Sequence, residues 1–324
     1  MRHSARQRDS ARASRAWTDA DIPQQSGRTA VVTGATGGLG LRIAEVLASR
    51  GARVLLTSRD PGRGAAALER VAAAGPVDTP PELVELDVSS LASVRTAASE
   101  IRARTGDRVD LLVNNAGVMA PPLGYSTDGI EQQWATNVIG PAALTWLLLP
   151  AIESTPGSRV IFVSSDRHRG ASFDEARLRA DLRGEDYRGF DYYGRTKLAD
   201  LLLSFELDRH FREGGIDALS AAAHPGFTAT NIVANGFAGL PPFAHRVATW
   251  AAGVFGQPVQ QGALPILYAA TAPHMSGSRY FGPTGLFELR GAPGSATRST
   301  LSRSAELGAV LVRCIEEVTG IVAP

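Results

Sequence analysis

The stretch TAVVTGATGGLGLRIAEVLASR, residues 29–50, joins a short apolar run to a segment of helical spacing through a glycine-rich turn. An apolar run followed by a helix-length segment predicts a strand and then a helix. Glycines in such a turn let the backbone approach a pyrophosphate closely, and the amino terminus of the helix offers free NH groups to the anion. Residues 29–50 therefore predict the dinucleotide-binding start of an α/β domain.

Apolar runs and helix-length segments continue to alternate along the rest of the chain. We expect further strands at 53–57, 83–86, 109–113, 159–164, 216–222 and near 280. We expect helices at 39–50, 62–74, 90–105, 132–152 and 192–212. Because strands joined by right-handed helical crossovers lie parallel, the expected fold class is α/β, a Rossmann-type doubly wound parallel sheet with helices on both faces. With about seven strands, its order is expected to be 3-2-1-4-5-6-7.

Composition excludes several classes of protein. The 33 basic and 32 acidic side chains nearly balance and the body of the chain has no dense cluster of cations, so no nucleic acid is expected as a partner. The single cysteine, Cys314, cannot form an intramolecular disulfide or a cysteine-based metal site, which fits a reducing cytoplasm. His168, His210 and His274 show no ligand spacing, so no metal is expected and these side chains are placed at the surface. The longest strongly apolar stretch, 142–152, is shorter than the roughly 20 residues that cross a bilayer, so no membrane span is expected.

Lys197 is the only lysine among the basic side chains, and every other cation is an arginine. A compact ammonium at this one position suggests a role that a planar guanidinium cannot fill. Tyr193 precedes it by four residues, so on a helix both side chains project from the same face. A phenol ionises with a pKa of about 10, and a nearby ammonium lowers that pKa toward the range useful for general acid–base catalysis. The pair therefore indicates a site for proton transfer.

Several motifs, in the order of the expected strands, carry a family resemblance. The turn reads Gly34-x-x-x-Gly38-x-Gly40, and Gly34-x-x-Gly37-x-x-Gly40 fits it as well. The other motifs are Asn114-Asn115-Ala116-Gly117, Asn137, Ser164-Ser165, Tyr193-x-x-x-Lys197 and His224-Pro225-Gly226 followed by Thr228 and Thr230. Together they resemble the classical type of the short-chain dehydrogenase/reductase family over nearly all of 27–290. The second reading of the turn resembles the extended epimerase branch of that superfamily.

The resemblance implies a role for each matching residue. Ser165 would hold and polarise a substrate oxygen, and Tyr193 would exchange a proton with it. Lys197 would assist Tyr193, and Asn137 would take part in a proton relay. Contacts with the dinucleotide are expected from Gly34, Thr36, Gly38, Leu39, Gly40, Arg59, Asp87, Val88, Asn115, Ala116, Gly117, Tyr193, Lys197, Pro225, Gly226, Thr228 and Thr230. For Asp87, capping of the following helix is the alternative.

The residues that end the second expected strand bear on the choice of cofactor. An acidic side chain there binds the ribose of NAD, whereas a cation receives the 2′-phosphate of NADP. Ser58 occupies the usual acidic place and Arg59 follows it, which favours NADP(H) over NAD(H). Asp60 could instead pair with Arg59 or cap the next helix.

Other features resemble the retinol-dehydrogenase-like branch of the family. They are the segment 17–23, the long polar connection 166–191, Lys197-Leu198-Ala199-Asp200 and Phe287-Glu288. The branch reduces or oxidises lipophilic aldehydes, alcohols and ketones, so we expect an NADP-dependent ketoreductase or alcohol dehydrogenase with a lipophilic small-molecule carbonyl or alcohol as substrate. A non-catalytic dinucleotide-binding regulator and an extended-type epimerase or dehydratase are the alternatives. The family also implies a homodimer or homotetramer through the helices that flank the fifth strand.

The chain is expected to have three parts. Residues 1–26 are rich in arginine and lack the apolar region of a secretory signal, which indicates a flexible tail. Residues 27–291 form the Rossmann-fold catalytic domain, and its apolar residues around 227–256 form a substrate lid or, alternatively, a helical pair over the sheet edge. Residues 292–324 form a C-terminal extension with an amphipathic helix that docks on its own domain or on another subunit.

Overall fold

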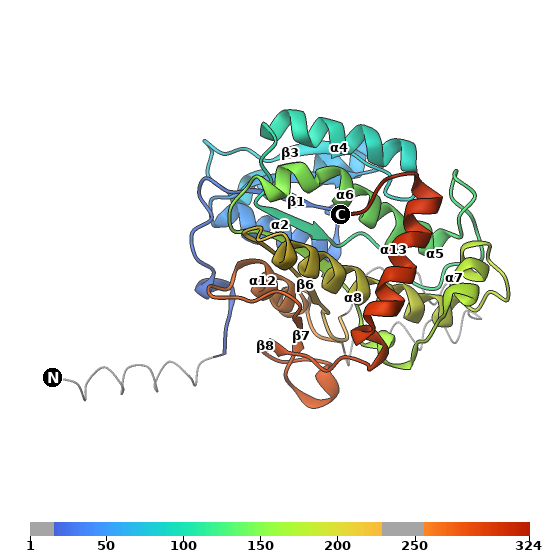
Figure 1. Ribbon diagram of the computed structural model, residues 1–324. Helices are drawn as coiled ribbons and strands as arrows, with labels where there is room; N and C mark the ends of the chain where they lie inside the picture. Colours follow the sequence, from blue (N-terminus) through green and yellow to red (C-terminus); the bar gives the residue numbers. More distant parts are fainter. Residues whose placement is uncertain (1–15, 229–255) are drawn as a thin grey trace, which may run out of the picture.

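The sheet of the molecule has the expected order with one strand added. The computed structural model describes residues 16–228 and 256–324, and within them eight strands follow the order β3-β2-β1-β4-β5-β6-β7-β8 (Figure 1). They are Thr29–Val32 (β1), Arg53–Ser58 (β2), Glu82–Glu85 (β3), Leu111–Asn114 (β4), Ser158–Val163 (β5), Ala218–Ala223 (β6), Tyr280–Pro283 (β7) and Pro293–Ser295 (β8). Strands β1 to β7 pair in parallel, and β8 pairs antiparallel with β7.

Strand β8 adds an antiparallel edge strand to the expected sheet of about seven parallel strands. Its three residues contain proline and glycine, which are depleted in strands, so no periodic pattern marks it in the sequence. Proline is tolerated there because β8 lies at the edge of the sheet. The segment 292–324, expected as an extension, therefore contributes one strand to the domain.

Helices cover both faces of the sheet, as expected. The helical elements are η1 Asp19–Asp21, α2 Gly38–Ser49, α3 Pro61–Ala74, α4 Leu91–Thr105, α5 Gln132–Trp134, η2 Ala135–Ile139, α6 Gly140–Glu153, η3 Asp166–Gly170, α7 Glu175–Leu182, α8 Gly189–Glu213, α11 Val259–Gly262, α12 Leu264–Thr271, η4 Leu286–Glu288, η5 Leu301–Arg303 and α13 Ala305–Thr319. Residues of α4, α6, α8 and α13 share one apolar core with alternate strand residues, and residues of α2, α3 and α12 share the other. The opposite directions of successive strand side chains produce these two cores.

The amino-terminal segment is partly folded onto the domain. Residues 1–15 of the expected tail lie outside the described residues. Trp17 packs edge-on against Tyr268 with ring centroids 5.2 Å apart, Ile22 is buried, and Asp19 forms an ion pair with Arg42. Apolar burial thus brings residues 17–26 into the folded part of the chain, although their composition assigns them to the tail.

The segments expected to be irregular or peripheral gain structure from packing. The connection 166–191 contains η3 and the helix α7. Helix α13 docks on its own domain, where it crosses α8 and also contacts α7 and α6 (Figure 1). It lies on the α6 and α8 surface through which the family resemblance implies a dimer. The expected lid around 227–256 lies outside the described residues except at its ends.

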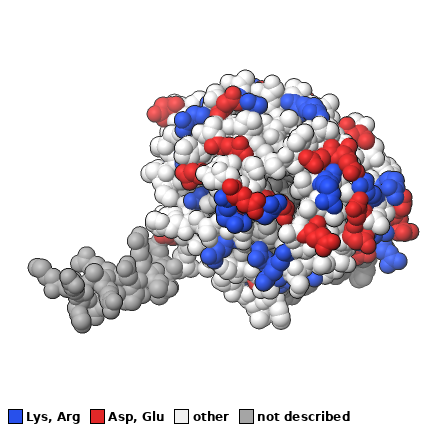
Figure 2. Space-filling view, in the orientation of Figure 1, with Lys and Arg blue, Asp and Glu red and all other residues white. Residues whose placement is uncertain are grey.

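One helix among the described residues is long and apolar enough to span a membrane. It is the continuous helix 132–153, which is mostly buried and packs against α4 as a core helix. The charged side chains on the face seen in Figure 2 are interspersed, with acidic and basic groups side by side. That arrangement agrees with the formal charge of +1.

Candidate active site

The glycine turn leaves the carboxyl end of β1 and begins α2. Gly34 has φ +65°, and a Cβ there would lie 2.9 Å from the Cα atom of Ala116. A Cβ on Gly40 would lie 2.5 Å from the Gly34 carbonyl oxygen. Only glycine fits these two places, because the turn packs directly against both the helix and the segment after β4. The resulting cradle and the free NH groups of α2 fit the pyrophosphate of a dinucleotide.

The segment after β4 is tied to the end of β1. Thr33 accepts hydrogen bonds at its hydroxyl from the backbone NH groups of Asn115 and Ala116, at 2.9 and 3.0 Å. The Asn115 amide donates to the Thr33 carbonyl oxygen at 2.8 Å. These bonds hold two adjacent strand ends together, which fixes the floor of the dinucleotide groove.

A groove along the carboxyl edge brings together the expected dinucleotide contacts from the first half of the chain. Its lining includes Gly34, Thr36, Gly38, Leu39, Gly40, Arg59, Asp87, Val88, Asn115, Ala116 and Gly117. A second cavity continues from it, because Leu39, Asn115 and Gly117 line both. This cavity is lined by Ser165, Tyr193, Lys197, Pro225, Gly226 and Thr228. Thr230 lies outside the described residues.

The groove ends at the carboxyl terminus of β2. Arg59 is exposed there, and Arg63 from α3 lines the same groove. The Asp60 carboxylate accepts a hydrogen bond from the Arg63 backbone NH at 2.9 Å and caps α3, which was one of its two alternative roles. Two cations therefore line this end of the groove. The sequence signal for Arg63 was its position one turn after Arg59.

Asp87 does not cap α4. The N-cap is Ser90, and the Asp87 carboxylate accepts hydrogen bonds from the Ser89 backbone NH at 3.0 Å and from the Ser89 hydroxyl at 2.7 Å. Val88 lies against α6, since a Cβ on Gly140 would meet the Val88 carbonyl oxygen. The turn at 87–89 is therefore shaped by local bonds and close packing beside the groove.

Tyr193 and Lys197 project from α8 into the second cavity. The Lys197 ammonium lies 5.7 Å from the centre of the Tyr193 ring. It donates hydrogen bonds to the Val163 carbonyl oxygen at 2.9 Å and to the Asp200 carboxylate at 2.8 Å. The expected helical pairing is therefore present, and Asp200, expected only as part of the Lys197-Leu198-Ala199-Asp200 motif, is a direct partner of Lys197.

Ser165 follows β5 as the N-cap of η3 and lies beside Tyr193 in the cavity wall. Its hydroxyl donates to the Asp166 carboxylate at 3.0 Å and accepts from the Arg167 backbone NH at 3.3 Å. The Ser164 hydroxyl instead donates to the Lys197 carbonyl oxygen at 2.7 Å. Of the two adjacent serines, only Ser165 offers its hydroxyl beside Tyr193.

The pKa of Tyr193 is raised, although the sequence predicts that Lys197 lowers it. Burial has the largest effect and raises the pKa of Tyr193, while Lys197 and a hydrogen bond with Ser165 lower it. Burial opposes the charge of Lys197, but Asp200 and Tyr193 outweigh it, and the pKa of Lys197 is raised. The ammonium thus acts on the phenol in the expected direction, and desolvation outweighs its effect.

Asn137 lies in the π-helical turn η2, a form that often marks functional sites. Its amide oxygen accepts from the Val118 backbone NH at 2.8 Å, and its amide nitrogen donates to the Val118 carbonyl oxygen at 2.9 Å and to the Thr196 hydroxyl at 3.0 Å. Asn137 therefore ties the segment after β4 to α8. The residue lines neither the groove nor the second cavity.

The segment after β6 is held by a buried histidine. The His224 ring nitrogen Nδ1 accepts from the Gly226 backbone NH at 3.2 Å, and Nε2 lies 3.2 Å from the Glu288 carboxylate. Because Nδ1 is an acceptor, the geometry assigns a proton to Nε2, which donates to Glu288. The His224 and Glu288 pair thus shapes the Pro225-Gly226 turn at the cavity wall.

His168 is not a surface residue, contrary to the expectation. It is fully buried, with Nδ1 2.6 Å from the Ser165 carbonyl oxygen and Nε2 accepting from the Ser299 backbone NH at 3.2 Å. Burial lowers its pKa to about 4, so it is neutral at physiological pH. Its partners lie before and far after it in the sequence, and spacing alone could not reveal them.

Comparisons with known proteins agree with this geometry. Residues 28–174 match the family model described as short chain dehydrogenase. Polyprenol dehydrogenase of Mus musculus is 37% identical over 261 residues, which cover 79% of this chain and 75% of that protein. The chain belongs to the short-chain dehydrogenase family. Retinol dehydrogenase 14 of Homo sapiens is 36% identical over 276 residues and covers 79% of this chain and 78% of its own, which supports the retinol-dehydrogenase-like branch.

A solved structure supports the same fold. An uncharacterized protein of Mycobacterium paratuberculosis has a TM-score of 0.77 and 34% identity, with 96% of this chain and all of that chain covered. As a short-chain dehydrogenase, the protein is an oxidoreductase that uses a nicotinamide dinucleotide. Among the described residues, no cluster of histidine, cysteine and acidic side chains could hold a metal ion.

Proposed function

We propose that the protein is an NADP(H)-dependent oxidoreductase that transfers hydride between the nicotinamide and the carbonyl or alcohol group of a lipophilic small molecule. The observation that carries this proposal is the continuity of the two cavities. Leu39, Asn115 and Gly117 line both the groove of the glycine turn and the cavity that contains Ser165 and Tyr193. A dinucleotide held at the turn would therefore reach the acid–base side chains.

The side chains of the cavity supply the proton chemistry. When bound, the nicotinamide supplies or accepts the hydride. The Ser165 hydroxyl binds the substrate oxygen, and the Tyr193 phenol donates a proton to that oxygen or accepts one from it. The Lys197 ammonium, fixed by Val163 and Asp200, favours the phenolate that forms when Tyr193 gives up its proton.

The cofactor preference rests on the end of the groove. Arg59 and Arg63 line it, and Ser58 stands where an acidic side chain would repel a phosphate. Guanidinium groups bind phosphate oxygens with paired hydrogen bonds. These features support NADP(H) rather than NAD(H).

The substrate class rests on the apolar wall of the second cavity. Val118, Met119, Phe190 and Phe227 line it beside Tyr193. Two relatives are named for polyprenol and retinol, both lipophilic alcohols.

We also propose a cytoplasmic location. The lone cysteine, Cys314, is buried and free, which fits a reducing compartment.

The test is a hydride-transfer screen of lipophilic aldehydes, ketones and alcohols against NADPH and NADH. We expect turnover with at least one lipophilic substrate, faster with NADPH. Tyr193→Phe removes the proton donor and should lower turnover by about 10²-fold to 10⁴-fold.

Tyr192→Phe is the matched control, because the neighbouring Tyr192 is buried and donates to the Glu185 carbonyl oxygen instead. It should keep its turnover. Undiminished turnover in Tyr193→Phe would reject the proton path. Dinucleotide binding without any redox turnover would support the regulator instead, and inversion of a stereocentre would support the epimerase.

A further inference from the structure

Lys197 and Asp200 form a buried ion pair at the base of the second cavity. The two residues are 6% and 3% exposed, and the ammonium lies 2.8 Å from the carboxylate. They are three positions apart on α8, so the carboxylate meets the ammonium from its own helix. The Val163 carbonyl oxygen contacts the ammonium from β5. The Lys197 ammonium thus lies between two hydrogen-bond acceptors, one from α8 and one from β5.

Asp200 neutralises the charge of Lys197 next to Tyr193. A neutral phenol, the Lys197 ammonium and the Asp200 carboxylate carry no net charge together. Without the carboxylate, the phenol and ammonium would carry a net positive charge in a desolvated site, which favours the loss of a proton from the pair. Asp200 therefore opposes the effect of Lys197 on Tyr193.

Two further charged side chains, Asp166 and Arg167, line the second cavity. Asp166, which follows β5, lies beside Ser165 and its charge favours the protonated phenol. Strand β5 itself contributes the neutral carbonyl group of Val163. Of these two carboxylates, Asp200 alone touches the ammonium.

We propose that Asp200 is a positioning residue that holds the Lys197 ammonium in place and keeps Tyr193 protonated, so that carbonyl reduction extends to higher pH. The part of this inference that concerns reduction rests on the proposed function. The part that concerns protonation rests on the ion pair alone. Asp200 touches neither reacting atoms nor the dinucleotide groove, and it acts through Lys197.

Asp208 provides a matched control on the same helix. It is also buried, and its carboxylate accepts from the Ser220 backbone NH at 3.1 Å and from the Ser278 hydroxyl at 2.7 Å. These bonds connect α8 to β6 and to the segment before β7. Asp208→Asn therefore tests the loss of a buried carboxylate that has no contact with Lys197.

The direct experiment follows the ionisation of Tyr193 in the full-length protein without substrate. Phenolate absorbance is titrated with pH, and the titration of Tyr193→Phe is subtracted. In Asp200→Asn the amide oxygen can still accept from the ammonium, but the negative charge is lost. We expect the midpoint of Tyr193 to fall by about one pH unit. In Asp208→Asn it should stay unchanged.

The catalytic readout is the pH profile of carbonyl reduction. The alkaline decline of kcat should move to lower pH in Asp200→Asn by the same shift as the absorbance midpoint, and KM should change less than kcat. If Asp200→Asn does not fold, Asp200→Ser removes the same charge with a smaller side chain and takes its place. A shift in the Asp208 variant equal to that in the Asp200 variant would assign the effect to helix stability and overturn the inference.

The two proposals fail in distinguishable ways. An unmoved or raised Tyr193 midpoint in a folded Asp200 variant would overturn this inference, whether or not the enzyme is active. Absence of turnover in the wild-type protein would overturn the proposed function and leave the absorbance titration to decide the role of Asp200.

Discussion

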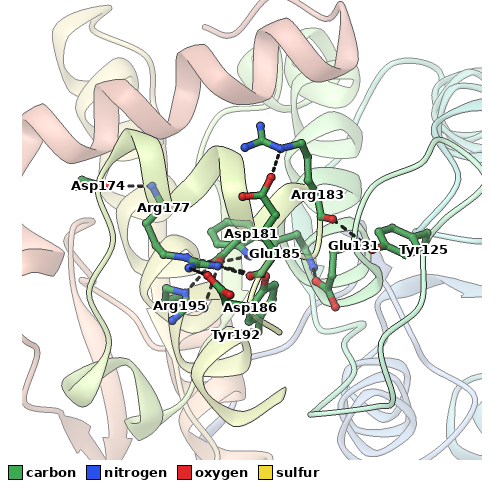
Figure 3. Close-up of polar contacts among 11 residues, drawn as sticks. Tyr125, Glu131, Asp174, Arg177, Asp181, Arg183, Glu185, Asp186, Tyr192 and Arg195 are labelled. Carbon is green, nitrogen blue, oxygen red and sulfur yellow. Dashed lines mark hydrogen bonds and ion pairs between the residues drawn. The ribbon is translucent and has the colours of Figure 1, made fainter. Parts of the chain in front are cut away.

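The buried carboxylates of Asp200, on α8, and Asp181, which faces α8, bind different cations. Asp200 pairs with the ammonium of Lys197 inside the active-site cavity. Asp181, on α7, pairs with the guanidinium groups of Arg177 and Arg195 and also accepts from the Trp134 indole NH at 3.3 Å (Figure 3). Both carboxylates have ordinary ion-pair geometry, so the difference lies in what each cation can do.

The arginine cluster joins structural elements, whereas the lysine pair serves chemistry. The Arg195 guanidinium stacks over the Tyr192 ring at 4.8 Å and donates hydrogen bonds to Asp181. Because a guanidinium is planar and has several donors, it can make both contacts at once and so hold α7 against α8. Lys197 is compact and its ammonium can lie close to the phenol of Tyr193. Arg195 and Lys197, two positions apart on one helix, thus face two environments, and the chain retains its single lysine in the one where protons move.

Of the substitutions that test this difference, Asp181→Asn should have the largest effect on the free energy of unfolding. It leaves Arg195 without its carboxylate partner and Arg177 with only the exposed Asp186, around a fully buried position. Breaking a buried ion pair in this way costs about 3 to 5 kcal/mol. We expect the free energy of unfolding, measured by urea denaturation, to fall by that amount while turnover per folded molecule changes little.

The control for this prediction is Asp174→Asn. Asp174 caps α7 by accepting from the Arg177 backbone NH at 2.8 Å, and asparagine is an equally good N-cap (Figure 3). Its unfolding free energy should stay close to that of the wild-type protein. Equal stability of the two variants would mean that the Asp181 cluster does not hold α7 in place.

A reciprocal exchange of the two cations should have the next largest effect. Lys197→Arg places a larger planar group in an enclosed site, so we expect turnover to fall by about 10²-fold with little loss of stability. Arg195→Lys loses the paired contact with Asp181 and the stacking on Tyr192, so we expect about 1 to 2 kcal/mol of lost stability with turnover retained. Steady-state kinetics and urea denaturation on both variants separate these outcomes. Similar losses of turnover in both would contradict the division of roles.

The features of the site that could be predicted from the sequence are those whose residues lie close together in the chain. Tyr193 and Lys197 are one helical turn apart, and the glycine turn is contiguous, so their proximity in the sequence is also proximity in space. The order of β1 to β7 was predictable because each of these strands has its own apolar run and right-handed crossovers join parallel strands. The role of Asp200 was not predicted, although its spacing from Lys197 allows it, because an acidic residue on a helix is usually solvated.

The arginine cluster could not be predicted because its members come from separate elements. Asp181 lies in α7, whose few apolar residues, Leu178 and Leu182 among them, make it resemble a polar loop in the sequence. Trp134 and Arg195 reach it from two other helices. Likewise, His168 is buried by contacts with distant residues. Such environments depend on tertiary packing, which periodicity does not report.

An effect smaller than that of Asp181→Asn is expected at Glu131, another buried carboxylate beside the arginine cluster (Figure 3). Its Oε2 atom accepts from the backbone NH groups of Gln133 and Trp134 at 2.9 and 3.0 Å, while its Oε1 atom is buried without a hydrogen-bond partner. Burial raises the pKa of Glu131 to about 7. Because the folded pKa lies above the unfolded value, its contribution to stability is complete in acid below the unfolded pKa and is lost as the pH rises through about 7.

Glu131→Gln should remove this dependence, because glutamine has no proton to lose and keeps an oxygen for the two backbone NH groups. We expect the unfolding free energy of the wild-type protein to decline by about 1 to 3 kcal/mol relative to the variant between pH 5 and about pH 8. Urea denaturation at several pH values measures the difference. Exposed Glu85→Gln is the control and should follow the wild-type curve. Parallel curves for the wild-type protein and Glu131→Gln would show that Glu131 is ionised throughout, and that the arginines of the Asp181 cluster compensate a second carboxylate as well.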